Sequence, residues 1–462
     1  MSGNQRVGTV TTTESRSRGR NLRRDALGVG AGTAIGVSST APAYSLAVSV
    51  GLLAAYTGAA APIVLAVSAV PVVLVALCFR ELNQAEPDCG TTFPWTEKAF
   101  GLGVGRMVGW TTVMACVLVM SNLAQVAAIY TYALLGLDGA EDSRLAQAAL
   151  GTVFILGMAL LAYRGVRIAA GTQLLLLSIE LVALLWFVVG AFREAGSPSI
   201  PAFSDTGQGA WAAGVLVAVF LYWGWDSSFS VNEESRNPRS TPAIAALISN
   251  AVLVVLYVVV AWAAVAYAGT EQLAGIADDD FLAVLGEDLL GTAGGKLLIA
   301  AVLVSALAST QTTILPTART MLSMARRDAF PGRFARISKR YQTPSVSTWV
   351  FAAASVLIYV TLVLTSDAVL ADSVAAVSIL VSLYYLATAL AVPVYFSGQI
   401  RGRVVQRVVV PLLATVSFVT VLVLAVADVG TGPLVVVGVT MVVGAAVMFS
   451  MKPPAEGEGR RR

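Results

Sequence analysis

The sequence predicts an all-α integral membrane protein that crosses the bilayer twelve times, and three observations support this. Of its 462 residues, 57% are hydrophobic and only 12% are charged, whereas about 25% are charged in ordinary soluble proteins. Apolar segments of roughly 20 residues, long enough to cross a bilayer as helices, alternate with short polar connectors. The basic residues gather on alternate connectors, as expected when one side of a membrane protein faces the cytoplasm.

The twelve expected spans follow the apolar runs, because a helix is the simplest structure that satisfies its own backbone hydrogen bonds in lipid. They lie at about 26–55, 62–82, 100–135, 147–163, 170–192, 210–232, 242–268, 292–322, 345–365, 371–397, 406–427 and 432–451. The polar, arginine-rich residues 1–25 are expected to form a disordered tail, and residues 452–462 a second, short tail. The longest outside connector, about 269–291, is acidic and is expected to be a solvated loop.

The basic residues also predict the orientation. With a cytoplasmic N-terminus, 27 of the 30 basic residues lie in cytoplasmic tails, connectors or span ends, and only Arg144, Arg193 and Lys296 lie outside. One helix more or fewer would reverse every later assignment and destroy this bias. We therefore expect a multi-pass protein of the cell membrane with both termini in the cytoplasm.

The composition argues against several functional classes. The chain has no histidine, which removes imidazole bases and histidine-bound metals. Its three cysteines have no CxxC spacing, so neither a disulfide framework nor a metal cluster is implied. HExxH, GxSxG and P-loop patterns are absent from the sequence, so we expect no enzyme, catalytic residue, metal or cofactor. The net charge of +3 gives no reason to expect a nucleic-acid partner.

Two of the predicted spans look unsuitable for continuous helices. The first reads GVGAGTAIGVSSTAPAYSL and contains several glycines before Pro42, and the sixth reads AGVLVAVFLYWGWDSSFSVNEESRNP with Gly224 among aromatic residues. Proline removes a backbone donor and clashes with the preceding turn. Irregular backbone at membrane depth is tolerated where it is buried in protein or lines a cavity, so each interruption is a candidate binding position.

The spacing of the interruptions supports this interpretation. If residues 26–192 form a repeat of five spans and residues 210–397 an inverted second repeat, both interruptions fall in the first helix of a repeat, and residues 406–451 supply two extra helices. Matched interruptions of this kind point to the substrate site of a transporter. The alternative is that both are packing kinks, since Gly and Pro are common in membrane helices.

Four segments resemble the amino acid permeases of the amino acid, polyamine and organocation transporter superfamily. They are GTAIGVSSTAPAYSLA, FRELNQAEPDCGTTFPWTEKAFG, YWGWDSSFSVNEESRNPRSTP and ILPTARTMLSMARRDAFP, in this order along the chain. The resemblance implies a leucine-transporter-type fold, with two inverted five-helix repeats and two further C-terminal helices, that moves an amino acid by alternating access. Many relatives carry Gly-Ser-Gly at the first interruption, where this chain has Gly36, Val37 and Ser38.

A zwitterionic substrate indicates which groups to expect at the site. Free backbone amides at the start of a half-helix can hold a carboxylate, and carbonyls freed at the end of another can meet an ammonium. Aromatic faces can cover a cation, although an interfacial aromatic belt is the alternative. The expected substrate-binding residues are Gly36, Val37, Ser38, Ser39 and Thr40 at the first interruption, Leu221, Tyr222, Trp223, Gly224 and Trp225 at the second, and Asn122 and Gln125 on the third span.

Two acidic residues, Glu180 and Asp226, lie within predicted spans. An ionised carboxylate is costly in hydrocarbon, so a carboxyl that changes protonation as a cavity opens is a basis for proton coupling. In sodium-coupled relatives of this fold, hydroxyls on the eighth span help to coordinate the ion, which makes Ser309 and Thr310 a possible sodium site. We expect proton-coupled uptake of an amino acid. The alternatives are sodium symport, exchange of amino acids or polyamines, and a membrane sensor that does not transport.

Overall fold

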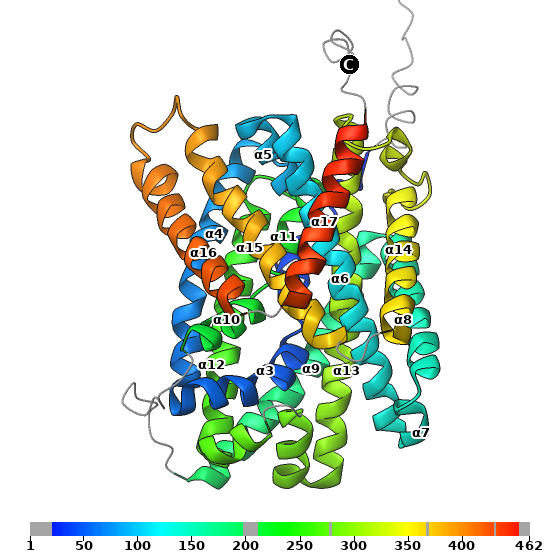
Figure 1. Cartoon of the computed structure of the whole chain (residues 1–462), viewed down its shortest axis with the longest axis vertical. Helices are drawn as coiled ribbons and strands as arrows, with labels where there is room; N and C mark the ends of the chain where they lie inside the picture. The colour runs from blue at the N-terminus through cyan, green and yellow to red at the C-terminus, as the bar shows by residue number, and fades with distance from the viewer. Residues whose placement is uncertain (1–20, 197–210, 277–279, 366–368, 429–430, 452–462) are drawn as a thin grey trace, which may run out of the picture.

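The computed structural model describes residues 21–196, 211–276, 280–365, 369–428 and 431–451. The two predicted tails lie outside these ranges, apart from residues 21–25. Within the described ranges the chain is helical, and its β-pairing is limited to two isolated bridges, Leu27 with Ser235 and Ile337 with Pro344. The predicted all-α architecture is therefore confirmed for the described part of the chain (Figure 1).

The helices of the first half run from α2 to α9. Their bounds are α2 Val29–Ser39, α3 Pro42–Thr57, α4 Ala61–Ala85, α5 Thr92–Phe100, α6 Leu102–Leu135, α7 Asp138–Glu141, α8 Arg144–Arg164 and α9 Val166–Ala195. Gly101, at φ 90°, separates α5 from α6. The third predicted span, about 100–135, corresponds to α6, and α5 is a separate short helix that precedes it.

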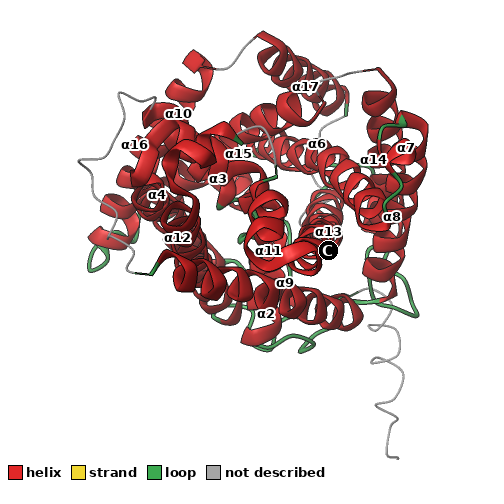
Figure 2. Ribbon diagram, turned by 90° about the horizontal axis from the view of Figure 1, so that it is seen from below, coloured by secondary structure: helices red, strands yellow, loops and turns green. Residues whose placement is uncertain are grey.

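The helices of the second half run from α10 to α17. Their bounds are α10 Trp211–Leu221, α11 Ser227–Ser230, α12 Thr241–Gly275, α13 Phe281–Arg326, α14 Ser345–Thr365, α15 Val369–Tyr395, α16 Val410–Asp428 and α17 Thr431–Ser450. Viewed along the bundle, the short helix α11 lies near the centre and longer helices surround it (Figure 2). Among these, α13 packs against α6, α9 and α3.

Within the described residues, ten helical segments are long and apolar enough to cross a membrane. One of them, Val29–Ala85, contains α2, α3 and α4 and covers the first two predicted spans. The sixth predicted span, 210–232, is not among the ten, because α10 ends at Leu221 and α11 has only four residues. The structure thus supports a multi-pass membrane protein, while its count of candidate spans differs from the predicted twelve.

The prediction of a solvated loop at about 269–291 is wrong. Helix α12 continues to Gly275 beyond a kink at Gly269 (φ 74°), and α13 begins at Phe281 and kinks at Gly291 (φ 70°). Asp280 caps α13, because its carboxylate accepts from the N–H groups of Leu282 and Ala283 at 2.9 and 3.1 Å. Four apolar side chains of the segment, Leu273, Phe281, Leu282 and Leu285, are fully buried, and this burial favours helix over a solvated loop.

An aromatic cluster fixes the second interrupted segment inside the bundle. The ring of Phe79 on α4 lies 5.3 Å from Trp95 on α5, 5.3 Å from Trp225 and 5.8 Å from Tyr385 on α15. Trp225 also stacks on Tyr385 at 5.7 Å. All four side chains are at most 2% exposed. Buried aromatic pairs stabilise beyond their area alone, so this cluster holds residues 222–226 against α4, α5 and α15.

Candidate functional site

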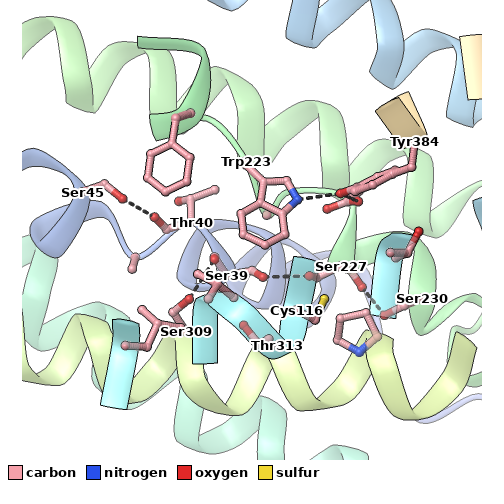
Figure 3. A pocket seen from close by; sticks show the side chains of 18 of the residues that line it. Ser39, Thr40, Ser45, Cys116, Trp223, Ser227, Ser230, Ser309, Thr313 and Tyr384 are labelled. Carbon is pink, nitrogen blue, oxygen red and sulfur yellow. Dashed lines mark hydrogen bonds between the residues drawn. The ribbon is translucent and has the colours of Figure 1, made fainter. Parts of the chain in front are cut away.

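A polar cavity lies between the two interruptions (Figure 3). Its volume is about 50 Å³, room for roughly four water molecules at about 10–15 Å³ each. Most of its wall comes from the two interruptions, α6 and α13. The lining residues are Ser39, Thr40, Ala41, Tyr44, Ser45, Thr91, Thr112, Cys116, Val119, Leu123, Phe220, Trp223, Gly224, Asp226, Ser227, Ser230, Ser309, Thr313, Pro316, Thr320 and Tyr384.

The first interruption falls between α2 and α3. Helix α2 ends at Ser39, Ala41 adopts a left-handed conformation (φ 48°, ψ 64°), and α3 begins at Pro42. Proline explains this position, because it disfavours helical geometry in the residue before it and is well suited to the first turn of a new helix. The chain therefore leaves its helix next to the cavity.

The predicted role of the Ser38–Thr40 amides does not fit this geometry. These residues close α2, so they lie where a helix presents carbonyls and the negative end of its dipole. The N–H of Thr40 donates to the carbonyl of Val37 at 3.1 Å, and the N–H of Ala41 donates to Ser38 at 3.2 Å. Because these amides are already used locally, the expectation of free amides at the start of a half-helix is wrong.

The second interruption comprises residues 222–226, between α10 and α11. Gly224 adopts φ 127°, a conformation that L side chains rarely adopt. A Cβ atom at this position would lie 2.6 Å from the backbone carbon and oxygen of Ser39 and 2.8 Å from the nitrogen of Thr40. The two interruptions therefore touch, and the close approach requires glycine.

Replacing Gly224 with alanine is expected to lower the melting temperature of the protein and abolish ligand binding. The strained backbone alone costs about 1–3 kcal/mol, and the new methyl group collides with main-chain atoms that cannot rotate away. Gly30→Ala is the matched control, because a Cβ on Gly30 meets nothing within 4 Å and alanine favours helix. Thermal unfolding of both variants in detergent measures the difference. Parental stability and binding in Gly224→Ala would contradict the close contact.

Asp226 is the only carboxylate among the residues that line the cavity, and none of them is lysine or arginine. Tyr384 donates its hydroxyl to Oδ2 of Asp226 at 2.9 Å, and Nε1 of Trp223 donates to the Tyr384 hydroxyl at 2.5 Å. This chain of hydrogen bonds joins the second interruption to α15. A carboxylate with neutral partners inside a membrane protein is well placed to receive a cationic group.

Hydroxyl groups join the two interruptions to α13. The hydroxyls of Ser39 and Ser227 share a hydrogen bond at 2.7 Å, and Ser309 donates to the carbonyl oxygen of Ser39 at 3.0 Å. Two serine hydroxyls that share one hydrogen bond retain one hydrogen between them for another acceptor. The Ser39–Ser227 pair can therefore donate to an anionic group in the cavity.

Glu180 lies outside the cavity, on α9, and is fully buried. Its Oε1 accepts from the backbone N–H of Ala43 at 2.5 Å and from the Ser305 hydroxyl at 2.8 Å. Ala43 belongs to the first turn of α3, where a negative charge is stabilised by free amides and the helix dipole. The Glu180 carboxyl thus ties α9 and α13 to the beginning of α3.

Six of the residues predicted from the sequence line the cavity, namely Ser39, Thr40, Trp223, Gly224, Asp226 and Ser309. The others lie outside its wall. Gly36 is packed so closely on Ser228 and Ser249 that a Cβ would lie 2.4 and 2.5 Å from their hydroxyls. Thr310 donates to the carbonyl of Ala306 in its own helix at 2.8 Å. Val37 and Ser38 are buried in α2.

The remaining predicted residues have structural partners next to the cavity. Asn122 accepts a hydrogen bond from the hydroxyl of Tyr44, which itself lines the cavity. Gln125 donates to Gln147 at 3.3 Å. The carbonyl of Leu221 accepts from Tyr257, Tyr222 donates to the carbonyl of Leu65, and Trp225 belongs to the aromatic cluster.

The sequence interpretation missed one face of α6. The predicted residues Asn122 and Gln125 lie outside the cavity wall, whereas Thr112, Cys116, Val119 and Leu123 form it. Tyr384 on α15 and Thr313 on α13 were missed as well. The i, i+4 spacing of Thr112 and Cys116 is a signal that could have indicated this face.

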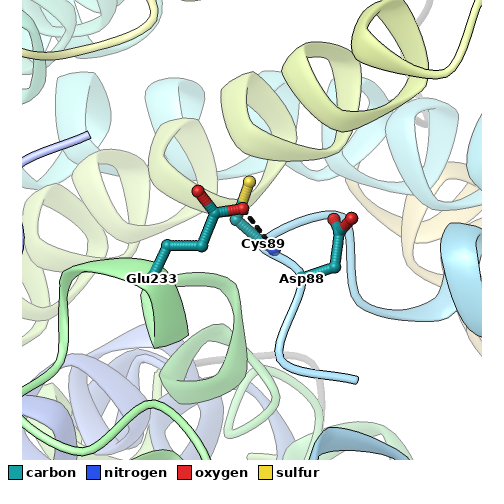
Figure 4. Close-up of side chains that lie close together, drawn as sticks. All are labelled: Asp88, Cys89 and Glu233. Carbon is teal, nitrogen blue, oxygen red and sulfur yellow. Dashed lines mark hydrogen bonds between the residues drawn. The ribbon is translucent and has the colours of Figure 1, made fainter. Parts of the chain in front are cut away.

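A cluster of possible metal ligands lies apart from the cavity, where Asp88, Cys89 and Glu233 place ligand atoms within 4.8 Å of one another (Figure 4). The carboxylates already have cationic partners, because Glu233 pairs with Arg326 at 3.0 Å and Asp88 with Arg327 at 2.9 Å. Burial, followed by the charges of Glu233 and Asp88, raises the pKa of the Cys89 thiol well above its ordinary value. Because both carboxylates are already paired with arginines, we interpret the cluster as an ion-pair network.

The known proteins that this chain resembles in sequence include amino acid permeases and antiporters. The family model described as "Amino acid permease" matches residues 27–450. A branched-chain amino acid permease of Bacillus subtilis is 23% identical over 309 residues, which is 63% of this chain and 65% of the permease. An arginine/ornithine antiporter of Latilactobacillus sakei is 24% identical over 317 residues, or 64% of each chain.

A third relative is named for a different substrate. A methylthioribose transporter of Bacillus subtilis is 22% identical over 294 residues, which is 60% of this chain and 62% of the transporter. The chain thus covers slightly less than two thirds of the length of each of these three relatives. Because their names differ in substrate, the similarity indicates a class of transporter rather than one solute.

Proposed function

Because this chain belongs to the amino acid permease family, we propose that it carries an amino acid across the cell membrane through the cavity between its two helix interruptions. The single observation that carries this proposal is the position of the cavity. It is polar, it contains one carboxylate, and it lies where two interrupted helices meet inside an apolar bundle. Substrate sites of secondary transporters are built from interrupted helices in this way.

We propose twelve membrane spans arranged as two inverted five-helix repeats of the leucine-transporter type. The repeats cover residues 26–192 and 210–397, and α16 and α17, within residues 406–451, are the two extra helices. This proposed arrangement puts the interruption after α2 and the interruption after α10 in the first helix of each repeat. The distribution of basic residues supports an orientation with both termini in the cytoplasm.

The size of the cavity supports alternating access. A volume of about 50 Å³ suits a few water molecules rather than an amino acid. Substrate must therefore bind in another conformation, in which part of the wall has moved. Trp223 is a large wall residue held to α15 by the single hydrogen bond from its indole to Tyr384. We propose that rotation of this indole enlarges the cavity.

Within the cavity, we assign the two charged groups of the substrate to opposite partners. The ammonium lies near Asp226, the one anionic lining residue. The carboxylate accepts the one hydrogen that the bonded pair of Ser39 and Ser227 hydroxyls retains. The cavity lining contains no lysine or arginine that would neutralise Asp226. A substrate with a second amine, such as a cationic amino acid or a polyamine, is therefore a second candidate beside a neutral amino acid.

We propose that Glu180 couples transport to protons. When ionised, its carboxylate ties the first turn of α3 to α9 and α13. A neutral carboxyl is a weaker acceptor for backbone N–H than a charged one, so protonation loosens α3. Because Ala41, Tyr44 and Ser45 belong to the same segment and line the cavity, movement of α3 reshapes the site. Asp226 is the second group that can change its protonation during the cycle.

Glu180→Gln is expected to abolish accumulation of substrate driven by a pH gradient in proteoliposomes. Glutamine keeps an acceptor oxygen for Ala43 and Ser305 but cannot titrate, so exchange of labelled for unlabelled substrate should stay within about two-fold of the parent rate. Glu271→Gln on the exposed end of α12 is the control. Undiminished accumulation by Glu180→Gln would remove its coupling role. If the parent protein requires sodium instead of a pH gradient, Ser309 and Thr310 become the residues assigned to the coupling ion.

A further inference from the structure

A second opening, separate from the substrate cavity, lies on the outer face of the bundle between α6, α15 and α17. It is a groove of about 430 Å³. Its walls include Gly103, Val104 and Met107 near the start of α6, Leu383 and Tyr384 on α15, and Met441 on α17. Nothing in the proposed transport function uses this groove.

The groove opens toward lipid. All three of its helices are among the segments that can cross a membrane. The wall residue Val104 is 43% exposed, and the neighbouring residues Val439 and Val442 on α17 are 57% and 69% exposed, so the groove continues the lipid-facing surface. Thr111 also lines the groove, but its hydroxyl donates to the carbonyl of Met107 at 2.8 Å and to the sulfur of Met441 at 3.5 Å. Its polar group is therefore already satisfied.

These properties determine what can fill the groove. Water needs two to four polar partners to occupy a buried position, and these apolar walls do not provide them. An empty groove would leave the wall atoms without dispersion contacts. We infer that the groove binds an acyl chain of a membrane lipid. From Gly103 to Thr111 the helix rises about 12 Å at 1.5 Å per residue, most of the roughly 15 Å depth of one leaflet.

Tyr384 gives this site a connection to the cavity, because it lines both the groove and the cavity. Its hydroxyl bonds to Asp226 and Trp223 on the cavity side. An acyl chain in the groove contacts Tyr384 from the opposite side and supports this residue in its present position. The bound chain thus stabilises the wall that closes the substrate cavity.

The test is a substitution that places a bulky side chain in the groove. A Cβ on Gly103 meets nothing within 4 Å, so Gly103→Phe places its ring in the groove without backbone collision. Gly157 on α8 is equally unobstructed, and Gly157→Phe is the control. The proteins are reconstituted with a phospholipid that carries a diazirine on its acyl chain, irradiated, digested and mapped by mass spectrometry.

We expect strong labelling of peptides containing Met107 and Met441 in the parent and in Gly157→Phe, and at least a five-fold loss in Gly103→Phe. Equal labelling in all three proteins, or labelling no stronger than on the exposed face of α16, would overturn the proposal. Val104→Trp fills the same groove if Gly103→Phe fails to fold. The readout does not depend on transport activity.

Discussion

Arg319→Met is expected to lower the free energy of unfolding by about 3–5 kcal/mol, because removing one partner of a buried ion pair leaves an uncompensated charge. The side chains of Arg319 and Glu234 are 1% and 0% exposed. Nε of Arg319 donates to Oε2 of Glu234 at 2.7 Å, and a second guanidinium nitrogen donates to the same oxygen. The pair joins α13 to the segment that follows α11.

The loss of stability should depend on pH. Burial raises the pKa of Glu234, and Arg319 opposes this shift. Without Arg319, the pKa of Glu234 in the folded protein rises further. The folded variant therefore keeps a proton on Glu234 at pH values where the unfolded chain has already released it. A group whose folded-state pKa is raised contributes stability that is fully present below its unfolded-state pKa and is lost as the pH rises through its folded-state pKa. The deficit of Arg319→Met relative to the parent should therefore be smaller at pH 5 than at pH 8.

A double variant separates charge from packing. Arg319→Met combined with Glu234→Leu replaces the ion pair with apolar groups, an exchange that is often neutral or stabilising in other proteins. We expect the double variant to recover most of the melting temperature that the single variant loses. If the double variant were less stable than Arg319→Met alone, the buried charge would not explain the effect.

Asp226→Asn is expected to weaken substrate binding by roughly 10- to 150-fold, the equivalent of the 1.5–3 kcal/mol that a hydrogen bond to a charged group contributes. Asparagine has the size of aspartate and keeps an acceptor for the Tyr384 hydroxyl, so the wall should remain intact while the charge that meets the ammonium disappears. Binding is measured by the substrate-dependent rise in melting temperature, which reports affinity for the folded state.

The matched control for this variant is Asp288→Asn. The Asp288 carboxylate accepts from Tyr267 at 2.8 Å at an exposed position on α13, and its loss should leave binding unchanged. An Asp226→Asn protein that bound the same amino acid with parental affinity would remove Asp226 from the site. A cationic substrate should lose more affinity in Asp226→Asn than a neutral amino acid, because it carries the larger positive charge.

The sequence predicted the interruptions because their causes are local. Pro42 and Gly224 each impose a backbone geometry on their own position, and the structure interrupts the chain beside both. The apolar runs and the alternation of basic residues likewise depend on the membrane and need no tertiary contact. The family match confirms the resemblance that the four motifs indicate.

The direction of side chains could not be predicted in the same way. Helix α6 is buried on nearly all sides, with 83% of its most apolar window inside the protein, so hydrophobic periodicity does not mark one face. Thr111 and Thr112 are adjacent and equally polar, yet only Thr112 lines the cavity. Tyr384 and Tyr385 present the same ambiguity on α15, where packing against Trp225 and Phe79 directs Tyr385 away from the cavity.

The central claim is that a transported amino acid occupies the cavity between the two interruptions, and Cys116 tests it most directly. Cys116 lines the cavity, whereas Cys78 and Cys89 are buried elsewhere and all three thiols are free. The measurement is the rate at which a small methanethiosulfonate reagent modifies Cys116 in a Cys78→Ala, Cys89→Ala protein. A saturating concentration of a transported amino acid should slow modification at least five-fold, and a non-transported one should not. An unchanged rate with the transported amino acid would contradict the claim.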